Sequence, residues 1–281
     1  RWLPDSAMKV VEYLETYAGK KDNPKFGLDR KNPFFIYWDP PSPHTPIVPN
    51  KDFQGKSGAG DYGDFVLEID HYVGKILDAL DNLKLADNTL VIFSSDNGPE
   101  TTAYERIQKH RHYSMGPLRG VKRDAWEGGH RVPLLVRWPG VVKPGQHCDE
   151  LVGLTDWLAT FADMSDLKLS DNEGEDSVSI MPLLKGSTKP VRESIIHHMP
   201  SGKFAIRHED WLLIDYKTGD GNGRRRKEPD WLRKERGVLP HRSNAELFNL
   251  KEDPQQTRNL YDQHPEKASE LKELLEKTKK G

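Results

Sequence analysis

The sequence of 281 residues lacks the features that mark several common classes of protein. It has one cysteine, Cys148, and so forms no internal disulfide and no multi-cysteine metal site. Its longest apolar runs, such as 90–93 and 132–136, are far shorter than the ~20 residues that a membrane-spanning helix needs. It contains no Asn-x-Ser/Thr acceptor for N-glycosylation. These absences argue against a disulfide-framed domain and a helical membrane protein.

The charge of the sequence is nearly balanced. There are 42 Lys and Arg against 44 Asp and Glu, which gives a net charge of -2. We therefore expect no nucleic-acid partner. The length is enough for one large domain, or for a large and a small one.

The apolar pattern of the first 160 residues predicts alternating helices and strands. Helical spacing is found at 7–17, 61–85 and 156–164, whereas short apolar runs predict strands at 34–38, 89–93 and 132–136. A strand, a helix and a further strand form a crossover unit, which joins parallel strands. The pattern thus predicts an α/β fold with a mostly parallel sheet sandwiched by helices.

The pattern changes after residue 190. Short alternating segments predict strands at 204–208, 211–216 and 246–250, followed by a charged helix at 265–279. We interpret residues 1–189 as part of an α/β domain and 190–281 as a smaller α+β subdomain.

Polar residues follow two of the predicted strands. Asp96 and Asn97 come after the strand at 89–93, and their hard oxygen atoms suit calcium, although Asp-Asn-Gly is also ordinary turn chemistry. His44 lies in Pro-His-Thr-Pro after the strand at 34–38, where a stiff loop holds an imidazole for proton donation or for a purely structural role. Ligands of parallel sheets bind at the carboxyl ends of strands, so we expect the two loops to face one crevice.

A glycine-flanked loop carries the next candidate. Residues 116–122 read Gly-Pro-Leu-Arg-Gly-Val-Lys, and a loop of this kind allows Lys122 to approach a tetrahedral anion. The segment lacks the Gly-x4-Gly-Lys spacing of a Walker loop. Trp-Glu-Gly-Gly-His-Arg-Val-Pro follows at 126–133, and we interpret Glu127 and Arg131 as an ion pair there. Farther on, 217–242 carries a net charge of +5, which is typical of a solvated loop or of a contact with an anionic ligand.

Taken in order, these segments resemble the formylglycine-dependent sulfatases of the alkaline phosphatase superfamily. The resemblance covers nearly the whole chain. It rests on the segments 33–35 (Pro-Phe-Phe), 43–46, 87–89 (Asp-Asn-Thr), 96–98, 116–122, 126–129, 246–250 (Glu-Leu-Phe-Asn-Leu), 253–254 (Asp-Pro) and 259–260 (Asn-Leu).

The resemblance implies a role for four residues. Asp96 and Asn97 would be calcium ligands, Lys122 would bind sulfate oxygens, and His44 would contact the sulfate and protonate the leaving oxygen. These groups suit sulfate-ester hydrolysis, because the negative charge that develops in the transition state must be neutralised.

One part of the sulfatase pattern is missing from the sequence. No Cys/Ser-x-Pro-x-Arg pentapeptide, whose first residue becomes formylglycine, is present, and Cys148 stands in another context. The resemblance therefore implies that roughly a hundred or more residues precede this chain and supply the nucleophile and the other calcium ligands. We expect the chain alone to bind calcium weakly and to be inactive, because calcium takes six to eight oxygen ligands.

The resemblance also suggests a sulfated carbohydrate as the substrate. Cationic residues expected to contact it are His110, Arg111, His112, 224–226, His197, His198 and Arg207. The expected partners are a sulfated small molecule or glycan and the remainder of the same polypeptide, in a bacterial periplasmic or secreted protein. The alternatives are a phosphate or phosphonate ester hydrolase of the same superfamily and a non-catalytic glycan-binding remnant.

Overall fold

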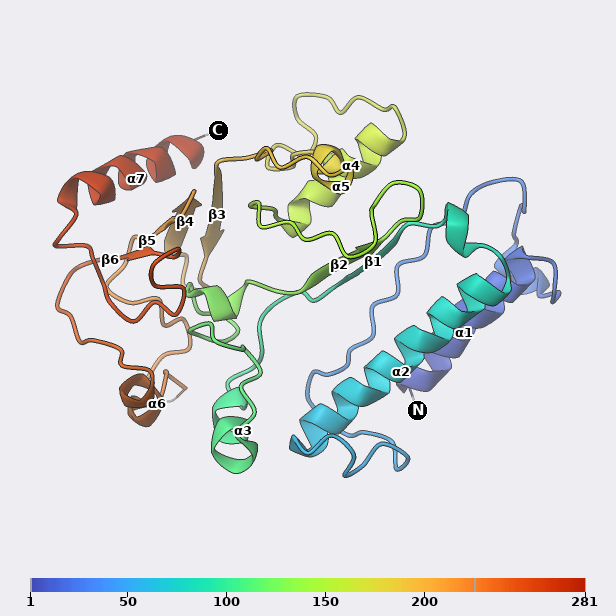
Figure 1. Cartoon of the computed structure of the whole chain (residues 1–281), viewed down its shortest axis with the longest axis horizontal. Helices are drawn as coiled ribbons and strands as arrows, with labels where there is room; N and C mark the ends of the chain where they lie inside the picture. Colours follow the sequence, from blue (N-terminus) through green and yellow to red (C-terminus); the bar gives the residue numbers. More distant parts are fainter. Residues whose placement is uncertain (1, 225, 281) are drawn as a thin grey trace. The chain divides into compact units, whose positions relative to one another are not determined.

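The chain forms two compact units of helices and small sheets (Figure 1). The computed structural model describes residues 2–224 and 226–280. The first unit comprises the residues up to Ile92 together with Arg106–His112 and Val136–Gly140. The second comprises Phe93–Glu105, Tyr113–Leu135 and the residues from Val141 onward. The predicted boundary near residue 190 stays a prediction.

Two long helices form the core of the first unit. α1 (Trp2–Tyr17) and α2 (Gly60–Asn82) pack side by side, as Figure 1 shows. Their contact buries Val11, Leu14, Ala79 and Leu80. Both predicted helices are confirmed. α1 begins earlier than the pattern indicates, because proline is tolerated in the first turn, where its missing N–H needs no partner.

The prediction of a buried strand at 34–38 is wrong. The segment lies outside any strand in the described structure. Phe34 and Ile36 pack against the α1–α2 core, whereas Phe35 and Tyr37 are 75% and 79% exposed. Alternate residues of the segment thus lie on a pair of helices instead of inside a sheet.

The strands predicted at 89–93 and 132–136 are confirmed with small shifts. β1 (Val91–Ser94) and β2 (Leu134–Arg137) form a two-stranded sheet. Because 34–38 joins no sheet, the large parallel sheet predicted from the crossover unit is not seen among the described residues.

The second unit contains an antiparallel sheet of four strands in the order β3-β4-β5-β6. β4 (Phe204–His208), β5 (Trp211–Ile214) and β6 (Glu246–Asn249) confirm the strands predicted from alternation. The edge strand β3 (Ser194–His198) pairs with β4 and was not predicted, because Ser-Ile-Ile-His-His does not alternate cleanly.

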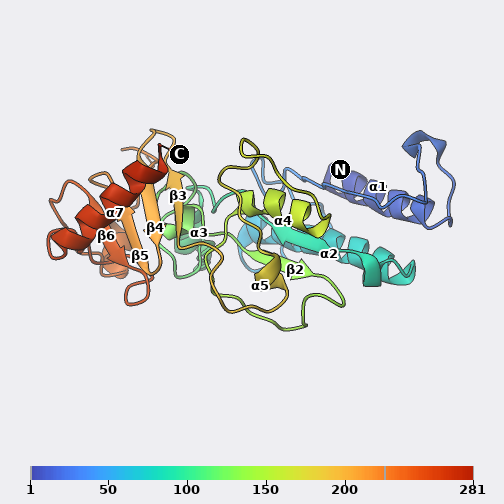
Figure 2. The ribbon, with the colours of Figure 1, turned by 90° about the horizontal axis from the view of Figure 1, so that it is seen from above.

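The two faces of this sheet pack against different partners. On one face Ile206, Leu213 and Leu247 contact α7 (Pro265–Thr278), which crosses beside the strands in Figure 2. Side chains of the opposite face pack around Trp126; they are Ala205, Leu212, Ile214 and Phe248. Because successive side chains of a strand point to opposite faces, one sheet holds both the last helix and the segment that follows Lys122.

The remaining elements are short. They are the helices α3 (Ala103–His110), α4 (Trp157–Met164), α5 (Met181–Leu184) and α6 (Asp230–Glu235), and 3-10 turns at Pro24–Phe26, Ala86–Asn88, Glu127–Gly129 and Leu154–Asp156. None of the helices in the described residues has the length and apolar character to cross a membrane.

Candidate functional site

The candidate calcium ligands lie in the turn that follows β1. Asp96 is exposed and Asn97 is half-buried. The side-chain nitrogen of Asn97 donates to the carbonyl oxygen of Gly98 at 2.9 Å. The side-chain oxygen of Asn97 and the carboxylate of Asp96 are therefore the atoms that this turn offers to a cation.

Backbone hydrogen bonds hold this turn against the loop at 116–124, here called the Lys122 loop. Gly98 donates to the carbonyl oxygen of Gly129 at 3.0 Å, and Lys122 donates to that of Pro99 at 2.8 Å. A Cβ atom on Gly98 would lie 1.9 Å from the carbonyl oxygen of Gly128, so only glycine permits this approach. The structure thus brings together two loops that the sequence separates by more than twenty residues.

The side chain of Lys122 is half-buried. Among the described residues, no carboxylate lies within 4.0 Å of its ammonium group. A partly desolvated cation without a counter-ion attracts an anion more strongly than a fully solvated one.

The backbone around Lys122 is held by Asn222. Its amide nitrogen donates to the carbonyl oxygen of Lys122 at 2.9 Å and to Asp124 Oδ1 at 2.8 Å. Its oxygen accepts from Arg123 Nε at 2.8 Å, and the guanidinium of Arg123 also pairs with Glu100. One amide from a distant loop therefore fixes three consecutive residues.

Asp124 contributes a buried carboxyl group to the same loop. Burial raises its pKa to about 7, against the opposing effect of hydrogen bonds donated by the backbone of Val121 and Gly221 and by the side chain of Asn222. These hydrogen bonds join Val121 of the same loop to residues 221 and 222 of the distant one, which indicates a structural role.

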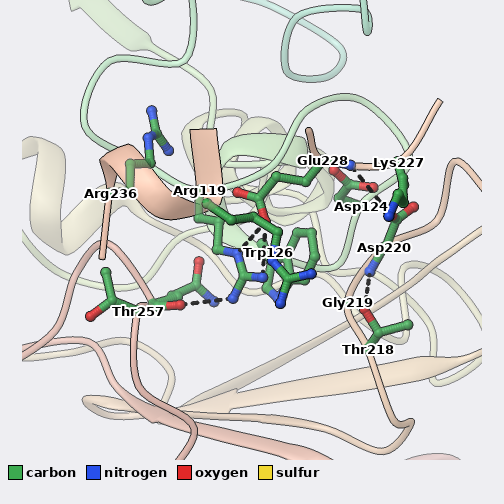
Figure 3. A network of polar contacts seen from close by, with 12 residues as sticks. Arg119, Asp124, Trp126, Thr218, Gly219, Asp220, Lys227, Glu228, Arg236 and Thr257 are labelled. Carbon is green, nitrogen blue, oxygen red and sulfur yellow. Dashed lines mark hydrogen bonds and ion pairs between the residues drawn. The ribbon is translucent and has the colours of Figure 1, made fainter. Parts of the chain in front are cut away.

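A buried ion pair connects the Lys122 loop to the segment around residue 228 (Figure 3). Arg119 contacts Glu228 Oε2 through Nε at 3.0 Å and through a terminal nitrogen at 2.9 Å. The guanidinium of Arg119 also lies 3.8 Å from the ring centre of Trp126 and donates to the carbonyl oxygen of Gln256. Trp126 in turn donates to Glu246 Oε2 at 2.8 Å.

The other residues predicted for the site lie in several places. His44 is exposed in the first unit, with Nδ1 2.8 Å from the carbonyl oxygen of Thr45. His110 and Arg111, at the end of α3, are also exposed. Burial lowers the pKa of the half-buried His112, and the nearby positive charge of Arg106 lowers it further.

Two substrate-binding candidates lie on the four-stranded sheet. His198 is exposed and its ring contacts Phe204. The Nη1 atom of Arg207 lies 3.5 Å from Glu127 Oε2. The predicted pair of Glu127 and Arg131 is confirmed at 3.4 Å, so the carboxylate of Glu127 has two cationic neighbours. Arg225, at the centre of the predicted cationic run, lies outside the described residues.

Sequence reasoning missed the pairing of His130 with His197. Their ring centres are 3.7 Å apart, and both Nε2 atoms donate to the carbonyl oxygen of Ala125, at 3.3 and 3.0 Å. Burial lowers the pKa of His130 to about 4 and that of His197 to about 3. The Asn222 contacts were missed as well, since its Gly-Asn-Gly context indicates only a turn.

Comparison with known proteins gives a consistent result. Residues 20–167, more than half of the chain, match the sulfatase family model, and 121–221 match the C-terminal model of N-sulphoglucosamine sulphohydrolase. The chain is 36% identical over 89% of its length to an N-acetylgalactosamine-6-O-sulfatase of Bacteroides thetaiotaomicron, covering 48% of that protein. It is 32% identical over 92% of its length to human arylsulfatase A, covering 49% of it.

Solved structures agree with these matches. A structure from work on the metabolism of multiple glycosaminoglycans by Bacteroides thetaiotaomicron superposes with a TM-score of 0.81 at 33% identity, over 98% of this chain and 54% of the other. A protein solved in complex with neocarrahexaose has a TM-score of 0.73 at 23% identity, over 98% and 54%, which shows a shared fold.

The chain belongs to the sulfatase family and has a sulfatase-like fold. It spans about half the length of the curated relatives it matches. The relatives named above are enzymes that act on sulfate groups.

Membership of the sulfatase family implies a calcium ion, and the turn that contains Asp96 and Asn97 offers donor atoms of the chemical type that calcium binds. A carboxylate and an amide oxygen are hard donors, and the amide nitrogen of Asn97 is already engaged by the turn. Within the described residues, no group of three or more His, Cys, Asp or Glu is placed to hold a metal ion. The turn is therefore suited to supply two of the six to eight oxygen atoms that calcium takes.

We predict that replacing Glu228 by Ala destabilises the fold by about 3–5 kcal/mol, because Arg119 is left buried without its counter-ion. Urea unfolding measures the difference. The control is Glu270→Ala, which breaks the exposed pair with Lys267 and costs at most about 1 kcal/mol. Equal effects of the two substitutions would contradict a buried, structural ion pair.

We also predict that His130 and His197 make the stability of the fold depend on pH. Both imidazoles stay neutral in the folded state while the unfolded chain takes up protons below the ordinary histidine pKa of about 6.5. The free energy of unfolding therefore falls as the pH drops from about 6.5 to about 4, by up to ~1.4 kcal/mol per pH unit for each histidine.

Urea unfolding at several pH values between 4.5 and 7.5 tests this pH dependence. The double variant His130→Gln, His197→Gln should lose stability less steeply than the parent as the pH falls, whereas the exposed His71→Gln should not differ from the parent. Identical slopes for the parent and the double variant would refute the prediction.

Proposed function

We propose that the protein containing this chain hydrolyses a sulfate ester on a carbohydrate. The observation that carries the proposal is the junction of the Asp96–Asn97 turn with the Lys122 loop, which combines cation-binding oxygens with an ammonium group that no described carboxylate pairs. Membership of the sulfatase family favours a sulfate ester over the phosphate and phosphonate alternatives. The Bacteroides relative at 36% identity is named for a sulfated amino sugar, which supports the choice of a carbohydrate.

In this proposal each residue of the chain has a definite task. Lys122 binds the sulfate oxygens and offsets the charge that grows on them in the transition state. Asp96 and Asn97 would supply two of the oxygen ligands of calcium, which would add positive charge to the site when bound. His44 donates a proton to the leaving oxygen of the sugar, which avoids the release of an alkoxide.

The nucleophile in this proposal is a formylglycine supplied by a part of the polypeptide outside this chain. The sequence holds no Cys/Ser-x-Pro-x-Arg segment, so no residue of the chain takes that role. His110, Arg111, His112, His198 and Arg207 remain candidates for contact with the sugar. Bacterial origin and a periplasmic or secreted location are proposed on the same basis, from the Bacteroides relatives.

We predict that Lys122→Ala in the complete enzyme lowers kcat/KM for a sulfated sugar by about 10²–10³-fold, because a charge-stabilising donor is lost from the transition state. Release of inorganic sulfate under steady-state conditions measures the effect. The control is Lys75→Ala, on the exposed surface of α2, which should keep the parent rate. An unchanged rate for the Lys122 variant would refute the role of this lysine.

A further inference from the structure

The described residues 220–224 and 226–228, here together called the basic loop, present cations to solvent. Arg224, Arg226 and Lys227 are exposed. Lys227 lies 3.4 Å from Asp230 Oδ1, itself an exposed group. For Arg224 and Arg226 the described part of the chain places no carboxylate within 4.0 Å of either guanidinium. These two side chains are therefore open to an external anion.

The base of the basic loop is closed by one carboxylate. Asp220 Oδ1 accepts hydrogen bonds from the backbone of Asn222 at 2.8 Å and of Gly223 at 3.2 Å. Asp220 Oδ2 accepts from the backbone of Glu228 at 3.3 Å, at the other end of the loop. Glu228 is buried in the ion pair with Arg119 (Figure 3). The loop is thus anchored at both ends.

The same base is bonded directly to the Lys122 loop. Gly221 donates to Asp124 Oδ1 at 2.9 Å, and Asn222 donates to the carbonyl oxygen of Lys122. A Cβ atom on Gly221 would lie 1.9 Å from the carbonyl oxygen of Arg123, so the two backbones touch. Arg224 is two residues beyond Asn222, at most about 7 Å further along the chain.

We propose that Arg224 and Arg226 form a second anion-binding site, which holds a further sulfate or carboxylate group of the same glycan whose reacting sulfate is bound at Lys122. This inference rests on the proposed function, since that function places the first sulfate at Lys122. Guanidinium groups bind sulfate and carboxylate through paired N–H donors. The hydrogen bonds at residues 220–223 and 228 restrict the ends of the basic loop before binding, which reduces the conformational freedom that binding costs. The site would thus select polyanionic glycans over singly sulfated compounds.

Direct binding tests the site without any turnover. The probe is a chondroitin sulfate hexasaccharide, and its dissociation constant is measured by titration calorimetry with the 281-residue chain at two salt concentrations. The double variant Arg224→Gln, Arg226→Gln should bind the probe about tenfold more weakly and with a smaller salt dependence. The matched control Lys277→Gln, Lys280→Gln removes the same charge from the exposed end of the chain and should bind as the parent does.

Kinetics of the complete enzyme separate this inference from the proposed function. The Arg224, Arg226 variant should show a raised KM for a multiply sulfated oligosaccharide, with kcat retained, and unchanged kcat/KM for a singly sulfated aryl sulfate. Equal binding of the probe by the variant and the parent, or equal weakening in the Lys277, Lys280 control, would overturn the second site. Failure of the complete enzyme to release sulfate from any substrate would overturn the proposed function, while selective loss of probe binding would still support the site.

Discussion

The buried ion pair between Arg119 and Glu228 is the contact on which the arrangement around Lys122 depends. Removing two charges from water is costly, and the structure offsets that cost with two N–H contacts to one carboxylate oxygen, a carbonyl acceptor and the face of Trp126. Lys122 lies in sequence between Arg119 and Trp126. The pair therefore fixes the loop on both sides of the candidate sulfate-binding residue.

The four-stranded sheet connects the Arg119–Glu228 pair to the core of the second unit through Trp126. Its α7 face is an ordinary apolar core, whereas its other face receives Trp126, whose indole nitrogen is satisfied by Glu246 on β6. Glu246 also accepts from the backbone of Gly219, just before the basic loop. One strand thus supports both the Lys122 loop and the neighbouring cationic loop.

Much of the secondary structure could be predicted because its signal is local. The apolar period of α2 and the alternation of β4 and β5 follow from which side of each element is buried. The prediction of a strand at 34–38 was wrong because strand formation depends on contacts that are not local. A strand exists through its hydrogen-bonded neighbours, and an apolar run contains no information about whether those neighbours are present. The pairing of His130 with His197 was equally inaccessible, because residues 67 positions apart meet only through the sheet.

For the candidate site, the sequence by itself determined the donor types and their order. Asp96 and Asn97 follow a strand, and Lys122 closes a glycine-flanked loop. Taken in order with the other segments of the resemblance, these motifs predict the sulfatase family that the family model then shows. Only the tertiary structure decided which cations are already paired: Arg119 and Arg207 contact described carboxylates, whereas the described residues leave the ammonium of Lys122 and the guanidinium of Arg224 without one. Ion pairing depends on distance and burial in space, and residue order along the chain fixes neither.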